Sequence, residues 1–246
     1  MKLRYEKKYL VRNLQLEALR NRFLPFLDPD LFAGSINQSH PEYTVRSIYL
    51  DTPDLESLYD KGDGIENRKK LRIRGYDLPN ADTEVFLEIK RKIGNRISKN
   101  RALIPYSKLS RLLEWGLDES LVSALDEKKM TENAIRFLYQ KNKNLQQPIN
   151  LIVYDREPYH GKFDPSVRIT FDKNIRSKFK PDLGELFSDF NFQSIWPQHF
   201  ILEIKYNEPP MPIWAKSIVE EFQLTSEALS KYVEGYYCHY LTPLKT

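Results

Sequence analysis

Basic residues alternate with apolar residues in three successive segments between positions 67 and 104. In the first segment, Lys70, Arg72 and Arg74 alternate with Leu71 and Ile73. A period of two is typical of a β-strand, because successive side chains of a strand point to opposite faces. This segment is therefore predicted to be a strand with one cationic face and one mostly apolar face.

The next two segments repeat the pattern, with Glu88 and Lys90 on one face of the second and Lys99 and Arg101 on one face of the third. A single polar face is common in antiparallel sheets. Like charges on neighbouring strands, however, repel one another and destabilise the sheet. We infer that a bound polyanion offsets the repulsion, because Arg and Lys are the usual donors to phosphate oxygens.

The same alternation predicts eight strands in all. They cover Leu3–Val11, Val45–Leu50, Arg68–Tyr76, Val85–Lys92, Lys99–Ile104, Asn150–Arg156, Val167–Asp172 and Phe200–Tyr206. Eight strands that carry charges on one face suggest a closed barrel. We therefore predict an α+β fold, an eight-stranded antiparallel β-barrel with a polar lumen and flanking helices, formed by residues 1–246 as a single domain.

Apolar residues at helical spacing predict the helices of this fold. They cover Leu14–Phe26, two or three helices between Ser107 and Asn144, Pro212–Phe222 and Glu227–Tyr240, with a short helical or irregular piece near Leu55–Tyr59. Asn13 is a suitable N-cap for the first helix, and Thr225 or Ser226 for the last. Pro25 is expected to disturb the last turn of the first helix.

The composition of the chain excludes several kinds of site and segment. The chain has 246 residues, 41% of them hydrophobic, and a net charge of +4, so a basic site must come from arrangement and not from bulk charge. Cys238 is the single cysteine, which excludes an internal disulfide and a cysteine-based zinc site. No apolar run approaches the roughly 20 residues of a membrane span, and the start has no signal-peptide pattern. The simplest expectation is a cytoplasmic protein.

Several motifs, in chain order, resemble the triphosphate tunnel metalloenzymes. Within that superfamily they are most similar to the VTC domain, the polyphosphate polymerase domain. The motifs are R-x-E-x-K at Arg4–Lys8, IYLDT at 48–52, LRIRGY at 71–76, FLEIKR at 86–91, VYDREPYHG at 153–161, VRITFD at 167–172, E-x-K at Glu203–Lys205 and SEALSKYVEG at 226–235. One departure is Arg4, which stands where the wider superfamily often has a glutamate.

The resemblance implies a tunnel that binds ATP, another triphosphate or inorganic polyphosphate together with Mn²⁺ or Mg²⁺. The implied substrate-binding residues are Lys8, Arg72, Arg74, Lys90, Lys99, Arg156, Arg168, Lys205 and Lys231. Arg72, Arg74, Lys90 and Glu203 are the expected catalytic residues, and Glu203 is the first candidate metal ligand, with Glu88 and Glu6 as alternatives. Carboxylate oxygens suit such hard cations.

Three functions share this site: polyphosphate synthesis from ATP, hydrolysis of tripolyphosphate or nucleoside triphosphates, and polyphosphate binding without catalysis. Nucleic-acid binding is not expected, because it favours an outer basic surface with exposed aromatic residues, whereas these charges are predicted to face inward. No membrane segment is predicted, although a membrane partner is compatible with the resemblance. The sequence leaves the oligomeric state open.

Overall fold

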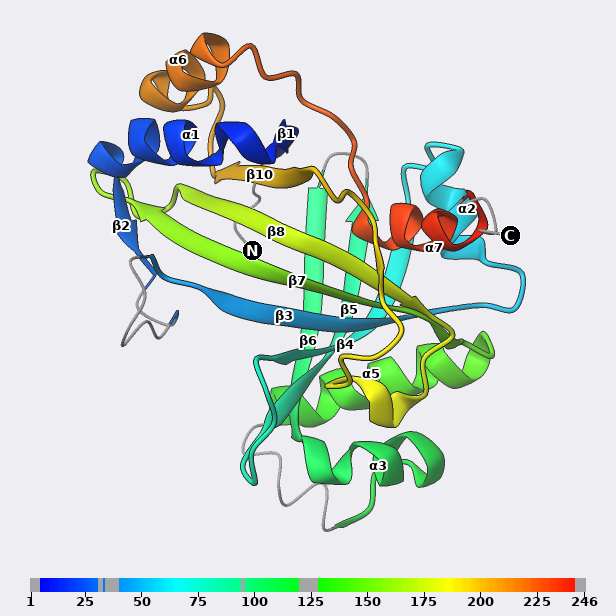
Figure 1. Cartoon of the computed structure of the whole chain (residues 1–246). Coiled ribbons are helices and arrows are strands. Elements are labelled where there is room, and N and C mark those ends of the chain that lie inside the picture. Colours follow the sequence, from blue (N-terminus) through cyan, green and yellow to red (C-terminus); the bar gives the residue numbers. More distant parts are fainter. Residues whose placement is uncertain (1–4, 31–32, 34–39, 94–95, 120–127, 242–246) are drawn as a thin grey trace. The chain divides into compact units, whose positions relative to one another are not determined.

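The computed structural model describes residues 5–30, 33, 40–93, 96–119 and 128–241 (Figure 1). The chain forms two compact units, each built from several stretches of sequence. Unit 1 comprises residues 1–44, 154–176 and 194–231, and unit 2 comprises residues 45–153, 177–193 and 232–246. Arg4 lies outside the described residues, and the single-domain assignment stays a prediction.

The described strands form one antiparallel sheet. They are β1 (Tyr5–Arg12), β2 (Leu27–Pro29), β3 (Tyr43–Asp51), β4 (Arg68–Tyr76), β5 (Glu84–Ile93), β6 (Arg96–Pro105), β7 (Gln147–Gly161), β8 (Arg168–Phe179), β9 (Gln193–Ser194) and β10 (His199–Tyr206). The strand order is β1-β10-β8-β7-β3-β4-β5-β6, with β2 paired to β7 and β9 paired to β8. Strands β7 and β8 each contribute residues to both units.

The antiparallel α+β class is confirmed, but the closed eight-stranded barrel is wrong. All eight predicted strands exist, and the described sheet adds β2 and β9, which have three and two residues and are too short to show alternation. The order of the described strands runs from β1 to β6 without closing. Alternation identifies the two faces of a strand but not its partners, so it cannot show whether a sheet closes.

The helices are α1 (Leu16–Phe23), α2 (Glu56–Gly62), α3 (Leu109–Trp115), α5 (Lys128–Lys143), α6 (Ile213–Glu221) and α7 (Lys231–Leu241). Pro25 lies in a 3-10 turn after α1, as its missing N–H predicts. The predicted cap at Asn13 is wrong, because its side chain donates instead to the carbonyl of Pro197 at 3.3 Å. Helix α7 begins at Lys231, four residues after the predicted start.

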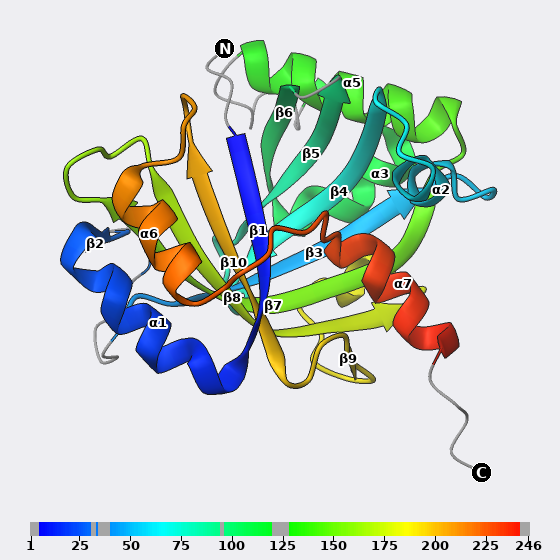
Figure 2. The ribbon, with the colours of Figure 1, turned by 90° about the horizontal axis from the view of Figure 1, so that it is seen from above.

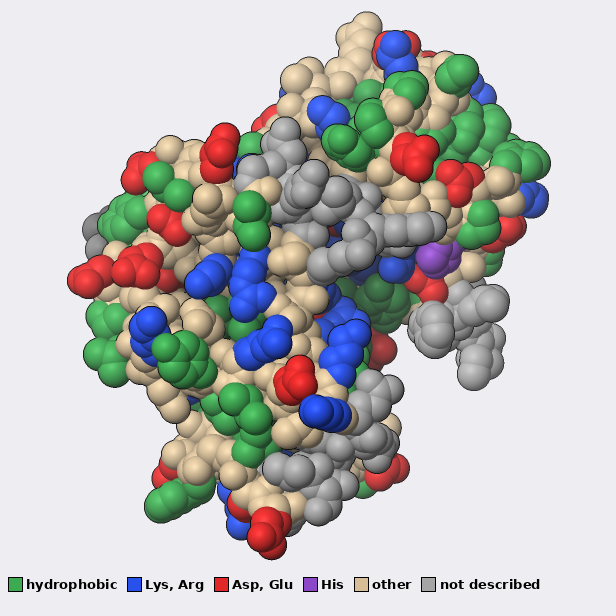
Figure 3. All heavy atoms as spheres, turned by 180° about the vertical axis from the view of Figure 1, so that it is seen from behind, with side chains coloured by type: hydrophobic (Ala, Val, Ile, Leu, Met, Phe, Trp, Pro, Cys, Tyr) green, Lys and Arg blue, Asp and Glu red, His purple; other side chains and the backbone are tan. Residues whose placement is uncertain are grey.

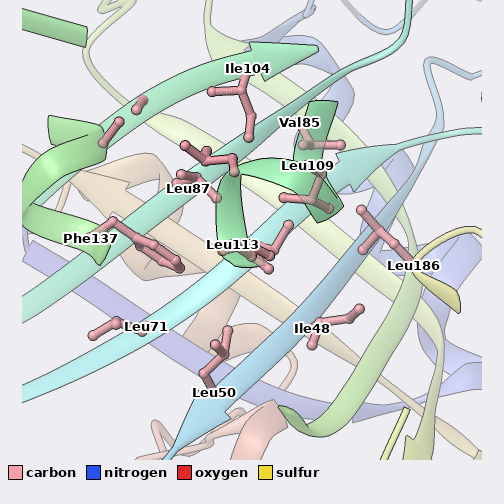
Figure 4. Packing of buried hydrophobic residues seen from close by; sticks show 14 of the residues in the cluster. Ile48, Leu50, Leu71, Val85, Leu87, Ile104, Leu109, Leu113, Phe137 and Leu186 are labelled. Atoms are coloured by element: carbon pink, nitrogen blue, oxygen red, sulfur yellow. The ribbon is translucent and has the colours of Figure 1, made fainter. Parts of the chain in front are cut away.

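The core of unit 2 lies on the apolar faces of β3 to β6. Buried residues from these strands pack against α3, α5 and the segment around Leu186 (Figure 4). Those labelled in the figure are Ile48, Leu50, Leu71, Val85, Leu87, Ile104, Leu109, Leu113, Phe137 and Leu186. This packing fixes the apolar side of each strand and so directs the alternating charged residues to the opposite side.

The core of unit 1 lies between its strands and two helices that run side by side, α1 and α6 (Figures 1 and 2). Phe23 of α1 makes edge contacts with Phe171 of β8 and Trp214 of α6, with ring centroids 6.3 and 6.2 Å apart. Phe26 stacks on Trp214 at 5.0 Å. As in unit 2, burial of one face of β1, β8 and β10 sets the direction of their polar residues.

Candidate functional site

On the face opposite the core, the central parts of strands β4, β5 and β6 of unit 2 (residues 70–74, 88–90 and 99–101) carry six cations and one carboxylate. We call this set the cationic face: Lys70, Arg72, Arg74, Glu88, Lys90, Lys99 and Arg101. The strand register places Lys70 opposite Lys90 and Lys90 opposite Lys99, so three lysines form one row across the sheet. Directly opposed like charges destabilise a sheet. A space-filling view also shows Lys and Arg side chains gathered on one face of the molecule (Figure 3).

Glu88 is the centre of the cationic face. Its side chain is fully buried and accepts hydrogen bonds from Arg72 at 2.5 Å and from Arg101 at 2.9 Å. Lys99 forms an ion pair with the same carboxylate. Burial by itself would raise the pKa of Glu88, but Arg72, Arg74 and Lys99 outweigh it and hold the pKa well below its usual range. The carboxylate therefore stays ionised at neutral pH.

Two lysines of the cationic face have lowered pKa values. Burial lowers the pKa of Lys99 to about 7, because nearby Arg72, Arg74 and Arg101 offset the favourable effect of Glu88. Burial also lowers the pKa of Lys70 to about 8, with Arg68 and Lys90 contributing. Burial, together with the neighbouring cations, therefore makes the charged form of these two lysines less favourable than in water.

Strand β3, on the other side of β4 from β5, supplies hydrogen-bond acceptors to Arg72 and Arg74. Arg74 donates from Nε to the hydroxyl of Ser47 at 3.0 Å, and Arg72 donates from Nη1 to the hydroxyl of Tyr49 at 3.1 Å. Both partners lie directly opposite their arginine in the register of β3 and β4. The guanidinium groups are thus oriented before any ligand arrives.

Unit 1 contains a second group of charges, which we call the ion-pair cluster: Glu6, Lys8, Arg156, Asp172, Glu203, Lys205 and Lys231. Arg156 donates both Nε and Nη2 to Asp172 at 2.7 Å, and Lys231, the first residue of α7, donates to Asp172 at 2.5 Å and to Glu203 at 3.2 Å. In contrast to the cationic face, its four cations are nearly balanced by three carboxylates.

Four cations contact Glu203. Lys8 and Lys231 lie near Oε1, at 3.5 and 3.2 Å, while Arg156 lies 3.4 Å from Oε2 and Lys205 pairs with the same oxygen. Burial alone would raise the pKa of Glu203, but Lys205, Lys231 and Lys8 hold it well below its usual range. Beside it in the register lies Thr170, whose buried hydroxyl has no hydrogen-bond partner among the described residues.

The glutamates predicted to bind a metal do not form a ready site for Mn²⁺ or Mg²⁺. Both oxygens of Glu203 and of Glu88 already contact Lys or Arg nitrogens, and Glu6 pairs with Lys8 at 3.2 Å. In the described part of the chain, no group of three or more His, Cys, Asp or Glu could hold a metal ion. The assignment of these glutamates as metal ligands stays a prediction.

Each of the predicted site residues belongs to one of these two sets except Arg168. Arg168 lies opposite Lys205 in the register and donates to Asp30 at 2.6 Å. The site list drawn from the sequence omitted Lys70, Arg101, Tyr49 and Asp172, which contact its members or lie opposite them in the register. Lys70 and Arg101 were visible in the alternation itself, whereas the role of Asp172 depends on a contact with residue 231 that spacing cannot predict.

A comparison with protein families agrees with the motifs. The sequence matches the VTC domain family over residues 3–240. No curated protein matches. Among solved structures, the chain is similar to the PH1819 protein from Pyrococcus horikoshii OT3, at 14% identity and a TM-score of 0.44, with 94% of this chain and 97% of that chain covered.

A second similar structure is HpAC1 from Hippeastrum, named as a candidate adenylyl cyclase and described as having a dominant triphosphatase activity. It is 13% identical, with a TM-score of 0.49, and the match covers 100% of this chain and 99% of that chain. In the described residues, no helix has the length and apolar character required to cross a membrane. Because the family match covers nearly the whole sequence, the chain belongs to the VTC domain family.

Proposed function

We propose that this protein binds the phosphates of a triphosphate or of inorganic polyphosphate on the cationic face and transfers the terminal phosphate of ATP to a growing polyphosphate chain. The observation that carries the proposal is the row of three directly opposed lysines, Lys70, Lys90 and Lys99, within the set of six cations and one carboxylate that we call the cationic face. Such a row is unfavourable in the protein alone and becomes favourable when a polyanion lies across it.

The spacing of the arginines suits a chain of phosphates. Arg72 and Arg74 are two residues apart on β4, so their Cα atoms lie about 6.6 Å apart at roughly 3.3 Å per residue. Hydrogen bonds to Glu88 and Ser47 orient the two guanidinium groups. The pair can therefore contact one phosphate chain at two points, each through several donors.

Within unit 1, the ion-pair cluster is a second candidate phosphate site by itself, with Lys8, Arg156, Lys205 and Lys231 as proposed ligands and Arg168 opposite Lys205. In the ligand-free protein, Glu203 and Asp172 form ion pairs with these cations. A phosphate that binds the cations must therefore compete with the two carboxylates. The hydroxyl of Thr170, which has no partner among the described residues, is a further donor for a phosphate oxygen. We propose that Glu203 positions the four cations around it.

Phosphoryl transfer requires positioning and charge neutralisation more than covalent help from the protein. In this proposal Arg72 and Arg74 hold the transferred phosphoryl group in line, and Lys90 neutralises charge that develops on the leaving group. A divalent cation would enter as part of the substrate, as Mn²⁺ or Mg²⁺ complexed to the triphosphate. The acceptor is a second phosphate chain, or water in the competing tripolyphosphatase and nucleoside triphosphatase hypothesis.

The reaction is tested by incubating the full chain with ATP and Mn²⁺, staining a gel for long-chain polyphosphate and assaying orthophosphate. We expect long polymer. Orthophosphate without polymer would replace synthesis by hydrolysis, and unchanged ATP together with retained tripolyphosphate binding would leave a binding protein. Cytoplasmic location and a membrane partner stay predictions.

The site itself is tested by the double variant Arg72→Ala/Arg74→Ala. Each hydrogen bond to a charged group contributes roughly 1.5–3 kcal/mol, so the affinity for tripolyphosphate should fall at least about a hundredfold at 1.4 kcal/mol per factor of ten. Calorimetric titration measures the loss. The matched control is Arg111→Ala, which removes an exposed arginine paired with Asp118. Equal affinity of the double variant and the control would remove both arginines from the site.

A further inference from the structure

Tyr49 lies on β3 directly opposite Arg72, at the edge of the cationic face. Its hydroxyl oxygen accepts a hydrogen bond from Nη1 of Arg72 at 3.1 Å. The guanidinium carbon of Arg72 lies 5.8 Å from the centre of the Tyr49 ring. The phenol is thus in direct contact with one of the two arginines proposed to bind phosphate.

The ring of Tyr49 is held by a stacked neighbour on α7. Tyr49 and Tyr232 stack with ring centroids 5.2 Å apart, and the Tyr232 hydroxyl donates to Asp51 at 2.5 Å. Asp51 is fully buried and also accepts hydrogen bonds from the backbone N–H groups of Thr52, Ser57 and Leu58. This network fixes the position of the Tyr49 ring without using its hydroxyl group.

The Tyr49 hydroxyl has one donor function for which the described residues supply no acceptor. A phenol can donate one hydrogen bond and accept others, whereas an arginine can only donate. The proton of Tyr49 therefore cannot point to Arg72, and among the described residues none accepts it. A phosphate oxygen is an acceptor of the required kind.

The charges around Tyr49 are mostly positive. Strand β4 brings Arg72, Arg74 and Lys70 to it, α7 contributes Tyr232, and Asp51 lies two residues further along the same strand. Burial would raise the pKa of Tyr49, but Arg72, Arg74 and Lys70 outweigh it and lower the pKa to about 7. The phenol is therefore sensitive to any anion that neutralises these cations.

We propose that the Tyr49 hydroxyl is a further phosphate-positioning group, which donates a hydrogen bond to a phosphate oxygen of a bound triphosphate while it accepts one from Arg72. This inference rests on the proposed function, because it requires a triphosphate on the cationic face. The Tyr49 hydroxyl would add a neutral hydrogen-bond donor beside the charged donors of Arg72, and so help to orient the phosphate chain.

Binding should then be coupled to protonation of Tyr49. In the ligand-free protein the phenol becomes largely ionised as the pH rises well above its pKa of about 7, and a phenolate cannot donate a hydrogen bond. A bound polyanion neutralises Arg72 and Arg74, raises the pKa of Tyr49 and so favours uptake of a proton. Lys70 and Lys99 also take up protons on binding, so the Tyr49 contribution must be measured as a difference between variants.

The test compares calorimetric affinities for inorganic tripolyphosphate of the full chain, of Tyr49→Phe and of the control Tyr106→Phe. Tyr49→Phe keeps the stacked ring and removes the hydroxyl, whereas Tyr106→Phe removes a hydroxyl that donates to the carbonyl of Gly184, away from the cationic face. At pH 6.5, Tyr49→Phe should bind about tenfold more weakly than the wild type, which is about 1.4 kcal/mol. At pH 8.5 this ratio should fall to about one or below, because the wild-type phenol is ionised.

A spectroscopic titration supplies a second readout. Ultraviolet absorbance of the ligand-free wild type and of Tyr106→Phe should show one tyrosinate forming near pH 7, absent from Tyr49→Phe and moved to higher pH by saturating tripolyphosphate. If Tyr49→Phe binds as tightly as the wild type at pH 6.5, or shows the same ratio at both pH values, the inference fails while the proposed site stands. If neither the wild type nor Tyr106→Phe binds tripolyphosphate, the proposed function fails as well.

Discussion

At the scale of single residues, Glu88 shows how one carboxylate makes a cationic surface possible. It is fully buried and contacts three of the six cations around it, Arg72, Lys99 and Arg101. A buried carboxylate with good partners is strongly favoured in its ionised form, as its lowered pKa indicates. Glu88 therefore holds the cations together in the ligand-free protein, where no phosphate is present to do so.

The first prediction concerns Glu88→Gln, which keeps the shape of the side chain and removes its charge. Breaking a buried ion pair costs about 3–5 kcal/mol, which corresponds to a thermal midpoint lower by roughly 6–20 °C at 2–4 °C per kcal/mol. Tripolyphosphate should raise the midpoint of this variant more than that of the wild type, because the face then carries one more net positive charge. Thermal unfolding with and without the ligand measures both effects.

Glu84→Gln is the control for this prediction, since Glu84 lies at the exposed start of the same strand, β5. Its midpoint and its ligand-induced shift should match those of the wild type. An unchanged midpoint for Glu88→Gln, or a smaller ligand-induced shift, would mean that Glu88 does not compensate the cationic face.

Much of the site could be predicted at this scale, because period-two alternation fixes which side chains share a face of a strand. The cations at positions 72, 74, 90 and 99 were identified in this way, and the register shows them side by side. What alternation cannot supply is the partner across the sheet. The pairing of Arg156 with Asp172 and the position of Tyr49 against Tyr232 depend on tertiary contacts between distant segments.

At the scale of elements, the sheet that carries the cationic face should become more stable as the pH rises from 7 to 9. The pKa values of Lys99, Lys70 and Tyr49 are lowered to about 7, 8 and 7. In this interval the unfolded chain keeps protons that the native protein has lost, so the free energy of unfolding increases with pH. The thermal midpoint of the ligand-free protein at pH 7, 8 and 9 measures the effect.

Two further measurements test this second prediction, the rise in stability between pH 7 and 9. Lys99→Gln removes one of the three groups and should reduce the rise, while a bound tripolyphosphate should reduce it further, because the polyanion favours the protonated lysines. A midpoint that falls between pH 7 and 9 in the ligand-free protein would contradict the lowered pKa values of this face.

Helix α1 is attached to the sheet of unit 1 by a buried ion pair between Arg20 and Glu157. Nε and Nη2 of Arg20 donate to the two oxygens of Glu157 at 2.7 and 2.8 Å, and Tyr159 also donates to this carboxylate. Burial would raise the pKa of Glu157, but hydrogen bonds from Arg20 and Tyr159 outweigh it and lower the pKa. The contribution of Glu157 to stability is therefore present above the ordinary glutamate pKa and is lost in more acidic solution.

The third prediction is that Glu157→Gln destabilises the protein by about 3–5 kcal/mol, because the buried Arg20 loses its buried, two-point partner and keeps only the exposed Glu17 as a counter-charge. Denaturant unfolding measures the change in free energy. Arg22→Ala is the matched control on the same helix, since its partner Glu221 is exposed and such surface pairs contribute about 0–1 kcal/mol. Equal losses in the two variants would show that the Arg20 pair is not the main attachment of α1.

At the scale of the whole molecule, the sequence predicted the elements better than their assembly. All eight long strands and the main helices were predicted from periodicity, because each buries one face against a core. The ten-stranded order and the open ends of the sheet could not be predicted, because they depend on which strands pair. The division into two compact units could not be predicted from the sequence either, because β7 and β8 continue from one unit into the other without a linker.

The last prediction is that the chain unfolds as one cooperative domain. The backbone passes between the two units within strands β7 and β8, so unfolding of either unit disrupts strands that contribute to the other. Glu157→Gln weakens unit 1, and Leu87→Ala creates a cavity in the core of unit 2 at a cost of about 2–5 kcal/mol. In calorimetry each variant should shift one single transition to lower temperature, with equal calorimetric and van't Hoff enthalpies. If the wild type shows two transitions, and each variant lowers a different one, the two units are separate domains.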